Sequence, residues 1–268
     1  RDDYDGTLTQ IALLVAEGEK AVGVACSVGI GIPGAPSRVT GLIKNANSTW
    51  LNGRALQADL EARLGTHVRL ANDANCMVVS EATDGAAAGA ALAFGVILGT
   101  GTGGGLVVNG VIVEGVNSIA GEWGHNPLPW ADVSELPGEP CYCGRSGCIE
   151  TWLSGPGLAR DYARASGEAV LSEEVVARAS RGDAQASEAL NRWEGRIARA
   201  LATVINVVDP EVIVVGGGLS AIERLYDHVP GLWSQWIFSD AVSTRLVPAK
   251  HGDDSGVRGA AGLWTISR

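Results

Sequence analysis

The sequence predicts an α/β fold from three observations. Continuous apolar runs at residues 21–32, 92–98 and 212–215 have the pattern of strands buried on both faces of a sheet. Segments with the three- and four-residue periodicity of helices separate these runs. Glycine-rich turns follow two of the strands, at residues 99–105 and 216–218. These patterns together predict helices packed on sheets of buried strands.

The first part of the chain predicts a helix, a strand and a polar loop. Residues 2–17 begin with acidic residues and carry an apolar face, which indicates a helix. After the first strand, Pro33 and Gly34 turn the chain toward the loop KNANSTW at residues 44–50. This loop offers many hydrogen-bonding groups, which suits recognition of a polyhydroxylated ligand. Asn and Ser also simply favour loops, so both interpretations stay open.

The next elements surround Asn72 and Asp73. Residues 55–64 and 74–88 are predicted helices, and residues 67–71 are a predicted short strand. Asp73 therefore lies at a strand end beside a helix N-terminus, where α/β proteins often place active-site groups. The same position suits a helix N-cap, and position alone favours the cap.

The strand at residues 92–98 leads into GTGTGGG, residues 99–105. Backbone N–H groups and threonine hydroxyls of such a loop can converge on phosphate oxygens. The spacing matches neither the P-loop nor the Rossmann pattern, and a glycine-rich hairpin is the alternative. Residues 106–113 around Gly110 predict a further tight hairpin.

Three of the five cysteines lie close together within residues 120–150. The spacing of Cys141, Cys143 and Cys148 holds their sulfurs at one turn, and His125 completes a Cys₃His set, a common composition for structural zinc. The alternative is a surface disulfide with one free thiol, but a one-residue gap suits disulfide geometry poorly. The sequence therefore predicts a zinc site.

The last third of the chain begins with helical patterns. Apolar residues recur from Leu190 to Val208 at helical spacing, and Asp209 and Pro210 end this long amphipathic helix. The strand at 212–215, the glycine turn and a predicted helix at 219–226 form either a nucleotide-binding edge or a tight packing corner. The remaining predictions are a helix, a strand and a terminal helix at residues 232–237, 244–249 and 255–264.

Composition limits the classes of partner. With 46% hydrophobic and 19% charged residues, the chain is an ordinary globular protein. Its net charge of -10 argues against nucleic acid as a main partner, because phosphate binding needs clustered Lys and Arg. No apolar run has membrane-spanning length and no signal peptide is visible, so we expect a cytoplasmic protein with no membrane partner. The odd cysteine count fits a reducing compartment.

The motifs taken together resemble the ROK family, which groups sugar kinases with sugar-responsive repressors. The resemblance rests on GIPG, NANSTWLNG, LANDANC, GTGTGGG, GEWGH, CYCGRSGCIE and VVGGGLS, which span residues 31–220. Within the family, NANSTWLNG, GEWGHNPLPW and the terminal HGDDSGVRGAA are most similar to bacterial fructokinases. The resemblance implies a two-domain, actin-like (ribonuclease H-like) sugar kinase fold. The small domain would be residues 1–88 joined by a C-terminal helix at 252–268, and the larger domain residues 89–251.

The resemblance also implies an activity and roles for single residues. The activity is ATP-dependent phosphorylation of a hexose, with D-fructose favoured and O6 as acceptor, and Asp73 is the general base. Sugar contacts are implied for Gly34, Asn47, Asn72, Asp73, Glu122, His125 and Glu150. Contacts with ATP are implied for Thr100, Gly101, Thr102, Gly103, Gly217 and Gly218, with Mg²⁺ accompanying the nucleotide. The zinc at His125, Cys141, Cys143 and Cys148 is structural in this interpretation.

The chain departs from the family pattern at its start. Kinases of this family open with a hairpin carrying a DxGGTK-type loop, and no such loop occurs here, so we expect the N-terminal hairpin to be missing. The alternatives within the family are a glucokinase or N-acetylhexosamine kinase, a sugar-sensing repressor, and a non-catalytic sugar-binding protein. A homodimer is a family-level expectation.

Overall fold

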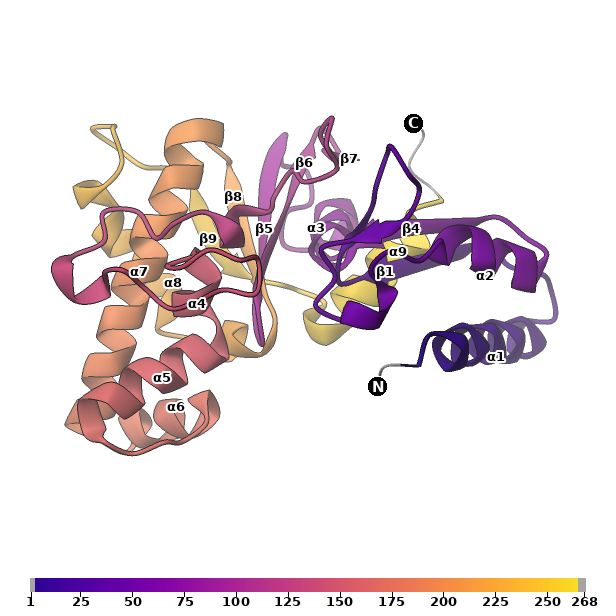
Figure 1. The fold of residues 1–268 in the computed structure, drawn as a ribbon. Coiled ribbons are helices and arrows are strands. Elements are labelled where there is room, and N and C mark those ends of the chain that lie inside the picture. Colours follow the sequence, from indigo (N-terminus) through magenta and orange to yellow (C-terminus); the bar gives the residue numbers. More distant parts are fainter. Residues whose placement is uncertain (1–2, 265–268) are drawn as a thin grey trace.

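The computed structural model describes residues 3–264. Figure 1 shows a smaller lobe that contains the N-terminal part of the chain and a larger lobe built on a five-stranded sheet. The smaller lobe contains α1 (Tyr4–Val22), the parallel strands β1 (Val28–Ile32) and β4 (Val68–Asn72), the short pair β2 (Ala35–Pro36) and β3 (Ile43–Lys44), and α2 (Leu56–Leu64).

The larger sheet has the strand order β7-β6-β5-β8-β9. Its bounds are β5 (Leu92–Leu98), β6 (Thr102–Val108), β7 (Val111–Ile112), β8 (Val212–Gly216) and β9 (Arg245–Pro248). The hairpin-connected strands β5, β6 and β7 pair antiparallel, whereas β5, β8 and β9 pair in parallel. Parallel pairing needs crossover connections, which the intervening helices supply. The α/β class predicted from the sequence is confirmed.

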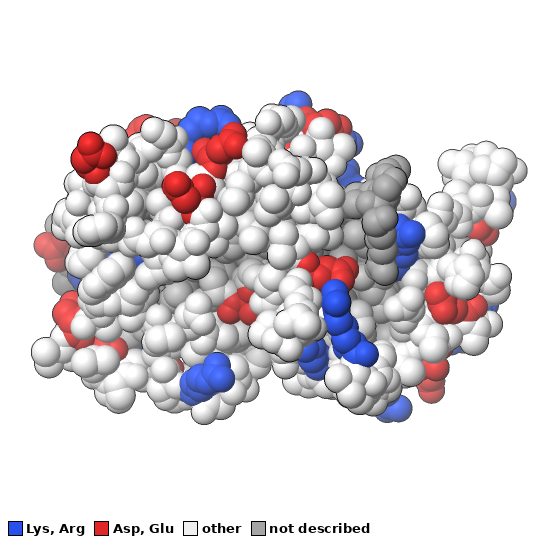
Figure 2. Space-filling model, turned by 90° about the horizontal axis from the view of Figure 1, so that it is seen from above, with Lys and Arg blue, Asp and Glu red and all other residues white. Residues whose placement is uncertain are grey.

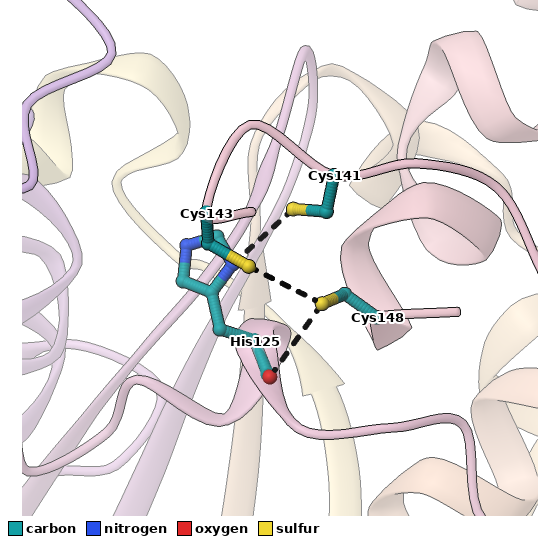
Figure 3. A group of neighbouring side chains, drawn as sticks. All are labelled: His125, Cys141, Cys143 and Cys148. Atoms are coloured by element: carbon teal, nitrogen blue, oxygen red, sulfur yellow. Dashed lines mark hydrogen bonds between the residues drawn. The ribbon is translucent and has the colours of Figure 1, made fainter. Parts of the chain in front are cut away.

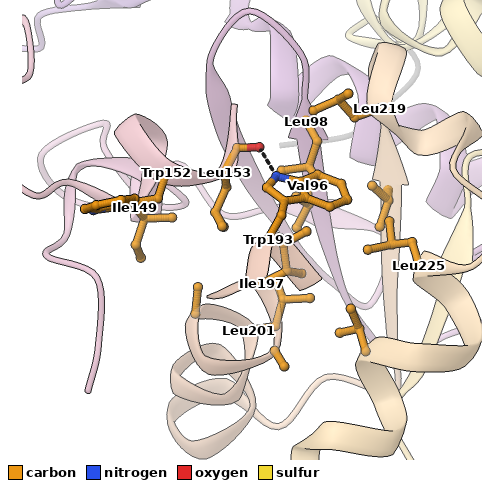
Figure 4. Close-up of a cluster of buried hydrophobic side chains, with 14 of the residues drawn as sticks. Val96, Leu98, Ile149, Trp152, Leu153, Trp193, Ile197, Leu201, Leu219 and Leu225 are labelled. Carbon is orange, nitrogen blue, oxygen red and sulfur yellow. Dashed lines mark hydrogen bonds between the residues drawn. The ribbon is translucent and has the colours of Figure 1, made fainter. Parts of the chain in front are cut away.

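One face of this sheet is covered by helices. They are α4 (Ile149–Leu153), α5 (Gly155–Ser166), α6 (Ser172–Ser180), α7 (Ala184–Val208) and α8 (Leu225–Leu232). Side chains alternate along each strand, so Val96 and Leu98 of β5 face the α7 side and pack in one cluster with Trp193 (Figure 4). The Trp193 indole N–H donates to the Leu153 carbonyl at 2.9 Å, so the buried polar end of this residue is satisfied.

The other face of the sheet packs on α3 (Asp73–Asp84). Met77 and Val78 of α3 pack in one cluster with Val212 and Val214, the β8 residues that alternate away from α7. The terminal helix α9 (Ser255–Gly262) lies along α3 and also packs on β1. A Cβ on Gly259 would lie 1.7 Å from the Cys76 carbonyl oxygen, so only glycine allows this approach. Helices α3 and α9 thus lie between the β1–β4 pair and the five-stranded sheet (Figure 1).

The proposed domain boundary and the missing hairpin stay predictions. The last four residues of the predicted C-terminal helix, 265–268, and the first two of the predicted N-terminal domain lie outside the described residues. Within residues 3–264, no helix is both long and apolar enough to cross a bilayer.

Several predicted bounds were wrong at their ends. The strand predicted at 21–32 begins only at Val28, because α1 continues to Val22 and ends at Gly23, whose φ of 76° is left-handed. The helix predicted at 74–88 begins one residue earlier and ends at Asp84. The residues after Asp84 that were predicted to continue this helix form a bend and a turn instead. There the Ala86 N–H donates to the Glu81 carboxylate at 2.7 Å and not to a backbone carbonyl of the helix.

The glycine turn after β8 is followed by less regular helix than predicted. Residues 218–221 form a 3-10 turn, and regular helix begins only at Leu225. The helix predicted at 232–237 is a 3-10 turn at Trp233–Gln235. The predicted terminal helix ends at Gly262, two residues earlier than expected.

Candidate active site

Asn72 and Asp73 lie where β4 ends and α3 begins. Asn72 is the N-cap of α3, and its Oδ1 accepts the Ala74 N–H at 2.9 Å. Asp73 is the first helical residue, and its Oδ1 accepts the same N–H at 2.8 Å. The N-cap is therefore Asn72, and the Asp73 carboxylate lies at the positive end of the α3 dipole, which favours an anion.

A cleft of about 260 Å³ opens beside this junction. It is lined by residues from both lobes, and ten of them are residues that the sequence singled out. These ten are Asn47, Asn72, Asp73, Thr100, Gly101, Thr102, Gly103, Glu122, His125 and Glu150. The fold thus brings together segments separated by about one hundred residues along the chain.

The GTGTGGG segment forms the turn and second strand of a hairpin. Leu98 pairs with Thr102, so residues 99–101 are the turn, and Thr102 and the following glycines belong to β6. The hairpin alternative is therefore correct as a description of the backbone. Thr100 and Gly101 nevertheless line the cleft, and Thr102 Oγ1 is buried without a partner among the described residues. This end of the hairpin thus lines the cleft and carries one hydroxyl group, that of Thr102, without a hydrogen-bond partner among the described residues.

Glu150 joins the turn to the cysteine segment. Its Oε2 accepts the Thr102 N–H at 3.0 Å, while Oε1 lies 4.0 Å from Cys141 Sγ. A Cβ on Gly101 would lie 2.6 Å from Glu150 Oε2, so glycine at this position leaves room for the carboxylate. Glu150, at the start of α4, thereby fixes the turn relative to the cysteines.

The four predicted metal ligands converge. The Nδ1 atom of His125 and the sulfurs of Cys141, Cys143 and Cys148 all lie within 4.8 Å of one another (Figure 3). Cys143 Sγ is 3.6 Å from Cys148 Sγ, and Cys141 Sγ is 3.6 Å from His125 Nδ1. Two donor atoms that each lie about 2.0–2.3 Å from one tetrahedral ion are separated from each other by a distance close to these 3.6 Å values. The donor set therefore fits zinc.

The same geometry speaks against the disulfide alternative. The described cysteines are all free, and the 3.6 Å between Cys143 and Cys148 sulfurs is far longer than a disulfide bond of about 2.05 Å. His125 turns its other nitrogen away from the sulfurs, because Nε2 lies 3.0 Å from the Tyr142 hydroxyl. A metal on Nδ1 therefore leaves Nε2 protonated and directed at the cleft lining.

Two cleft carboxyl groups have raised pKa values. Asp73 remains open to water, yet the surrounding protein displaces part of its hydration, and this desolvation raises the pKa of its carboxyl above the ordinary value. Desolvation also raises the pKa of Glu122, with smaller contributions from the negative charges of Asp73 and Glu150 and an opposing one from His125. Raised carboxyl pKa values are common at groups that take up protons in a reaction.

Not every predicted site residue lines the cleft. Gly34, Gly217 and Gly218 are absent from its lining. A Cβ on Gly34 would lie 2.7 Å from the Lys44 carbonyl oxygen, and one on Gly217, whose φ is 84°, 2.5 Å from the Leu98 carbonyl oxygen. Close packing explains the glycines at positions 34 and 217. The ligand roles of Gly34, Gly217 and Gly218 stay predictions.

The cleft also contains residues that the sequence reasoning did not select. Pro33, Asn45, Ile97 and Tyr142 line it. Asn45 belongs to the polar loop at residues 44–50 that suggested sugar recognition. The polar composition of that loop was the signal that could have indicated this residue. Tyr142 lies between two predicted metal ligands, and that position alone could have indicated it.

Two basic side chains of the smaller lobe contact the loop at residues 114–118. Arg38 donates to Glu114 at 2.8 Å and to Ser118 at 2.9 Å, and the Lys44 ammonium donates to the Asn117 carbonyl at 2.8 Å. In Figure 2, basic and acidic side chains meet near the centre of this face. These contacts tie the β2–β3 segment of the smaller lobe to the loop that leads to Glu122. Because the ion pair is exposed, its contribution is small.

Comparison with known proteins identifies the family. The model of the ROK family matches residues 1–266. The chain belongs to the ROK family. Two relatives of this ROK protein are the N-acetyl-D-glucosamine kinases of Photobacterium profundum and Escherichia coli O127:H6. Each is 40% identical over 267 residues, which are 98% of this chain and 88% of the relative.

Solved structures of the family confirm the predicted fold. A ROK hexokinase from Thermus thermophilus has a TM-score of 0.83 at 28% identity, over 96% of this chain and 85% of that one. A ROK family glucokinase from Streptomyces griseus, in complex with glucose and AMPPNP, has a TM-score of 0.82 at 26% identity, over 98% and 88%. The resemblance to fructokinases in particular is not confirmed by these comparisons.

Proposed function

We propose that this ROK protein transfers the γ-phosphoryl group of ATP to a hydroxyl of a hexose, with Asp73 as the general base. The observation that carries the proposal is the position of Asp73. Its carboxylate lies in the cleft at the N-terminus of α3, and the turn at Thr100 and Gly101 lines the same cleft. A base and a backbone turn that can hold phosphate thus share one cavity of about 260 Å³.

The carboxylate of Asp73 has the properties that proton abstraction needs. Oδ1 accepts the Ala74 N–H, and the side chain is exposed in the cleft, so Oδ2 can accept a sugar hydroxyl proton. The hydroxyl oxygen attacks the γ-phosphorus as its proton moves to Oδ2, and ADP leaves. The raised pKa makes this carboxylate a stronger base than an ordinary exposed aspartate.

The other cleft residues position the two substrates in this proposal. Asn72, Glu122, His125 and Glu150 hydrogen-bond the sugar hydroxyls, together with Asn47 from the smaller lobe. The turn residues Thr100 and Gly101, followed by Thr102 and Gly103, hold the phosphates. The cleft lining contains no Lys or Arg among the described residues, so Mg²⁺ bound with ATP supplies the neutralising charge.

The zinc ion, in this proposal, has a structural role. His125, Cys141, Cys143 and Cys148 would hold it on the far side of His125 from the cleft. The ion would fix the loop that carries His125 and the start of α4 that carries Glu150. Charge stabilisation of the transferred group does not require it.

N-acetyl-D-glucosamine is the acceptor that we favour. The two relatives at 40% identity are both N-acetyl-D-glucosamine kinases, and the alignment with each covers 98% of this chain. D-Fructose, which the motifs favoured, is the second candidate, because the NANSTWLNG loop places Asn45 and Asn47 in the cleft lining. Both sugars present a primary hydroxyl at C6 to the same base.

The test measures ADP release with ATP, Mg²⁺ and one sugar at a time, from N-acetyl-D-glucosamine, D-glucose, D-mannose and D-fructose. Asp73→Asn should lower kcat by roughly 10²–10⁴-fold while the variant still binds sugar. Asp240→Asn, an exposed aspartate outside the cleft, is the control. Unchanged turnover of Asp73→Asn refutes the base assignment. If the native chain binds sugar but does not phosphorylate it, the protein is a non-catalytic sugar-binding protein and the proposed activity is refuted.

A further inference from the structure

A second, smaller cavity adjoins the cleft, and neither the motifs nor the proposed mechanism gives it a role. It holds about 60 Å³, and Asn72 and Glu122 line both this cavity and the cleft. Asp73 lines the cleft but is not among the residues that line the smaller cavity. The side cavity, as we call it, therefore extends the site past Asn72 and Glu122.

The walls of the side cavity are mainly apolar and come from both lobes. The smaller lobe contributes residues of β2 and β4, and the larger lobe contributes a β7 residue and the loop that leads to Glu122. The apolar residues of the lining are Ala35, Pro36, Leu70, Ala71, Ile112, Ile119, Ala120 and Leu263. Such walls favour a ligand group that carries an apolar end.

The polar residues of the lining favour a neutral group. Glu114 and Ser118 already accept hydrogen bonds from Arg38, at 2.8 and 2.9 Å. Asn72 Oδ1 accepts the Ala74 N–H, which leaves the NH₂ group of Asn72 for a ligand. Asn75 also lines the cavity, and its buried Oδ1 has no hydrogen-bond partner among the described residues. Two side-chain amides, which can both donate and accept, thus border the cavity.

The size of the side cavity fits an acetamido group. A single water needs roughly 10–15 Å³ on the same measure, so 60 Å³ has room for about four atoms of that size. An acetamido group has four non-hydrogen atoms, which are the nitrogen, the carbonyl carbon and oxygen, and the methyl carbon. D-Glucose has a single oxygen at the same ring position. N-acetyl-D-glucosamine would therefore fill the cavity, and D-glucose would leave most of it to water.

The proposed reaction directs the C2 substituent of the sugar away from Asp73. The C6 hydroxyl lies at the base in that proposal, and C6 is attached to C5. C2 and C5 are opposite atoms of the six-membered sugar ring, so a group on C2 lies on the far side of the ring from C6. A cavity that Asn72 and Glu122 share with the cleft, and that Asp73 does not line, is placed to receive such a group.

We propose that the side cavity binds the acetamido group at C2 of an N-acetylhexosamine. The methyl group packs on the apolar wall that includes Ala71 and Ala120, and the amides of Asn72 and Asn75 hydrogen-bond the acetamide. The inference rests on the proposed function and deepens it, because it identifies the part of the protein that selects N-acetyl-D-glucosamine over D-glucose. Asn72 and Glu122 still contact the sugar hydroxyls from the cleft side.

The first test varies the sugar and leaves the protein unaltered. The native full chain is titrated calorimetrically with D-glucose, N-acetyl-D-glucosamine and N-butanoyl-D-glucosamine. The Kd of the N-acetyl sugar should be lower than that of D-glucose by roughly tenfold or more. The butanoyl group adds two carbons and exceeds the cavity, so its sugar should bind roughly tenfold or more weakly than the N-acetyl sugar.

The second test fills the cavity from its wall. Ala120→Val adds two methyl groups on the loop, and Ala71→Val adds them on β4 in case the first variant does not fold. In either variant, the Kd of N-acetyl-D-glucosamine relative to that of D-glucose should rise roughly tenfold or more. The control is Ala241→Val, an exposed loop alanine that lines neither cavity, and it should keep the native ratio.

The outcomes separate this inference from the proposed function, which ADP release measures. Equal Kd values for D-glucose and the N-acetyl sugar overturn the inference, and so does a butanoyl sugar that binds as tightly as the N-acetyl sugar. A native Kd ratio in a folded Ala120→Val or Ala71→Val variant also overturns it. The expected ratios without ADP release support the inference and refute the kinase activity. A native chain that binds none of the sugars refutes both.

Discussion

Glu81→Gln tests how the C-terminal segment is fixed to the helix at the cleft. Glu81 is fully buried near the end of α3. Its Oε2 accepts the N–H groups of Ala86 and Lys250 at 2.7 and 2.9 Å. Its Oε1 accepts the His251 N–H at 3.0 Å and the Ser255 hydroxyl at 2.7 Å. One carboxylate therefore satisfies four donors, three of which lead into α9.

Glutamine keeps the shape of this side chain but replaces one oxygen with an NH₂ group. With the amide carbonyl toward His251 and Ser255, the NH₂ group faces the N–H groups of Ala86 and Lys250, and both hydrogen bonds are lost. A hydrogen bond to a charged group contributes roughly 1.5–3 kcal/mol, so the two bonds give a loss of about 3 kcal/mol at the lower end. In a chain of this size, that loss corresponds to a fall in Tm of about 6–12 °C.

The assay is thermal unfolding of the native chain, Glu81→Gln and the control Glu188→Gln, which alters an exposed glutamate on α7. Burial alone would raise the pKa of Glu81, but its hydrogen bonds outweigh burial and hold the pKa below the ordinary value. The stabilisation is thus present above the unfolded-state pKa of about 4.3 and is lost as pH falls through the lower folded-state value.

We therefore expect the difference in Tm between the native chain and Glu81→Gln to be largest near neutral pH and to narrow below about pH 4. Glu188→Gln should follow the native chain at every pH. A variant as stable as the native chain would refute the reasoning. So would a difference in Tm that is independent of pH.

Four further outcomes are expected at the cleft. Removal of metal by a chelator should lower Tm and sugar affinity, and zinc should restore both; a chelated chain that behaves like the untreated one contradicts the metal site. The raised pKa of Asp73 predicts that kcat/KM falls on acidification at a pH above the ordinary value of about 3.9, and a profile flat down to that pH contradicts the base assignment. The same shift disfavours the charged form in the folded state, so Asp73→Asn should not lower Tm. Gly101→Ala should displace the Glu150 carboxylate, whose Oε2 would lie 2.6 Å from the new Cβ, and weaken ATP or sugar binding more than tenfold with little change in Tm; native KM values would show that the turn tolerates a side chain.

Local patterns predicted the elements whose causes are local. The apolar run at Leu92–Leu98 is the strand β5 with the same bounds, and the periodicity from Leu190 to Val208 lies within α7. The errors occurred where a contact distant in sequence or a turn decides the boundary. Gly23 ends α1 inside an apolar run, and no periodicity marks that point.

Chemical identity predicted much of the candidate site. Three closely spaced cysteines and one histidine have few uses other than a metal site, and their ligand atoms do converge. The position of Asp73 after a strand was readable from the order of elements. By contrast, the glycine-rich segment had two interpretations, and only the pairing of Leu98 with Thr102 identified the hairpin.

The sequence by itself determined the fold class, the family and the identities of most polar groups that line the cleft, because periodicity, turn residues and ligand types are written into short segments. Only the tertiary structure decided which donor meets which acceptor. Tyr142 against His125, Glu150 against Thr102 and Glu81 against Ser255 are pairs set by packing of elements 17 to 174 residues apart. A hydrogen bond depends on a few tenths of an ångström and on direction, and those quantities exist only once the helices and sheets have packed.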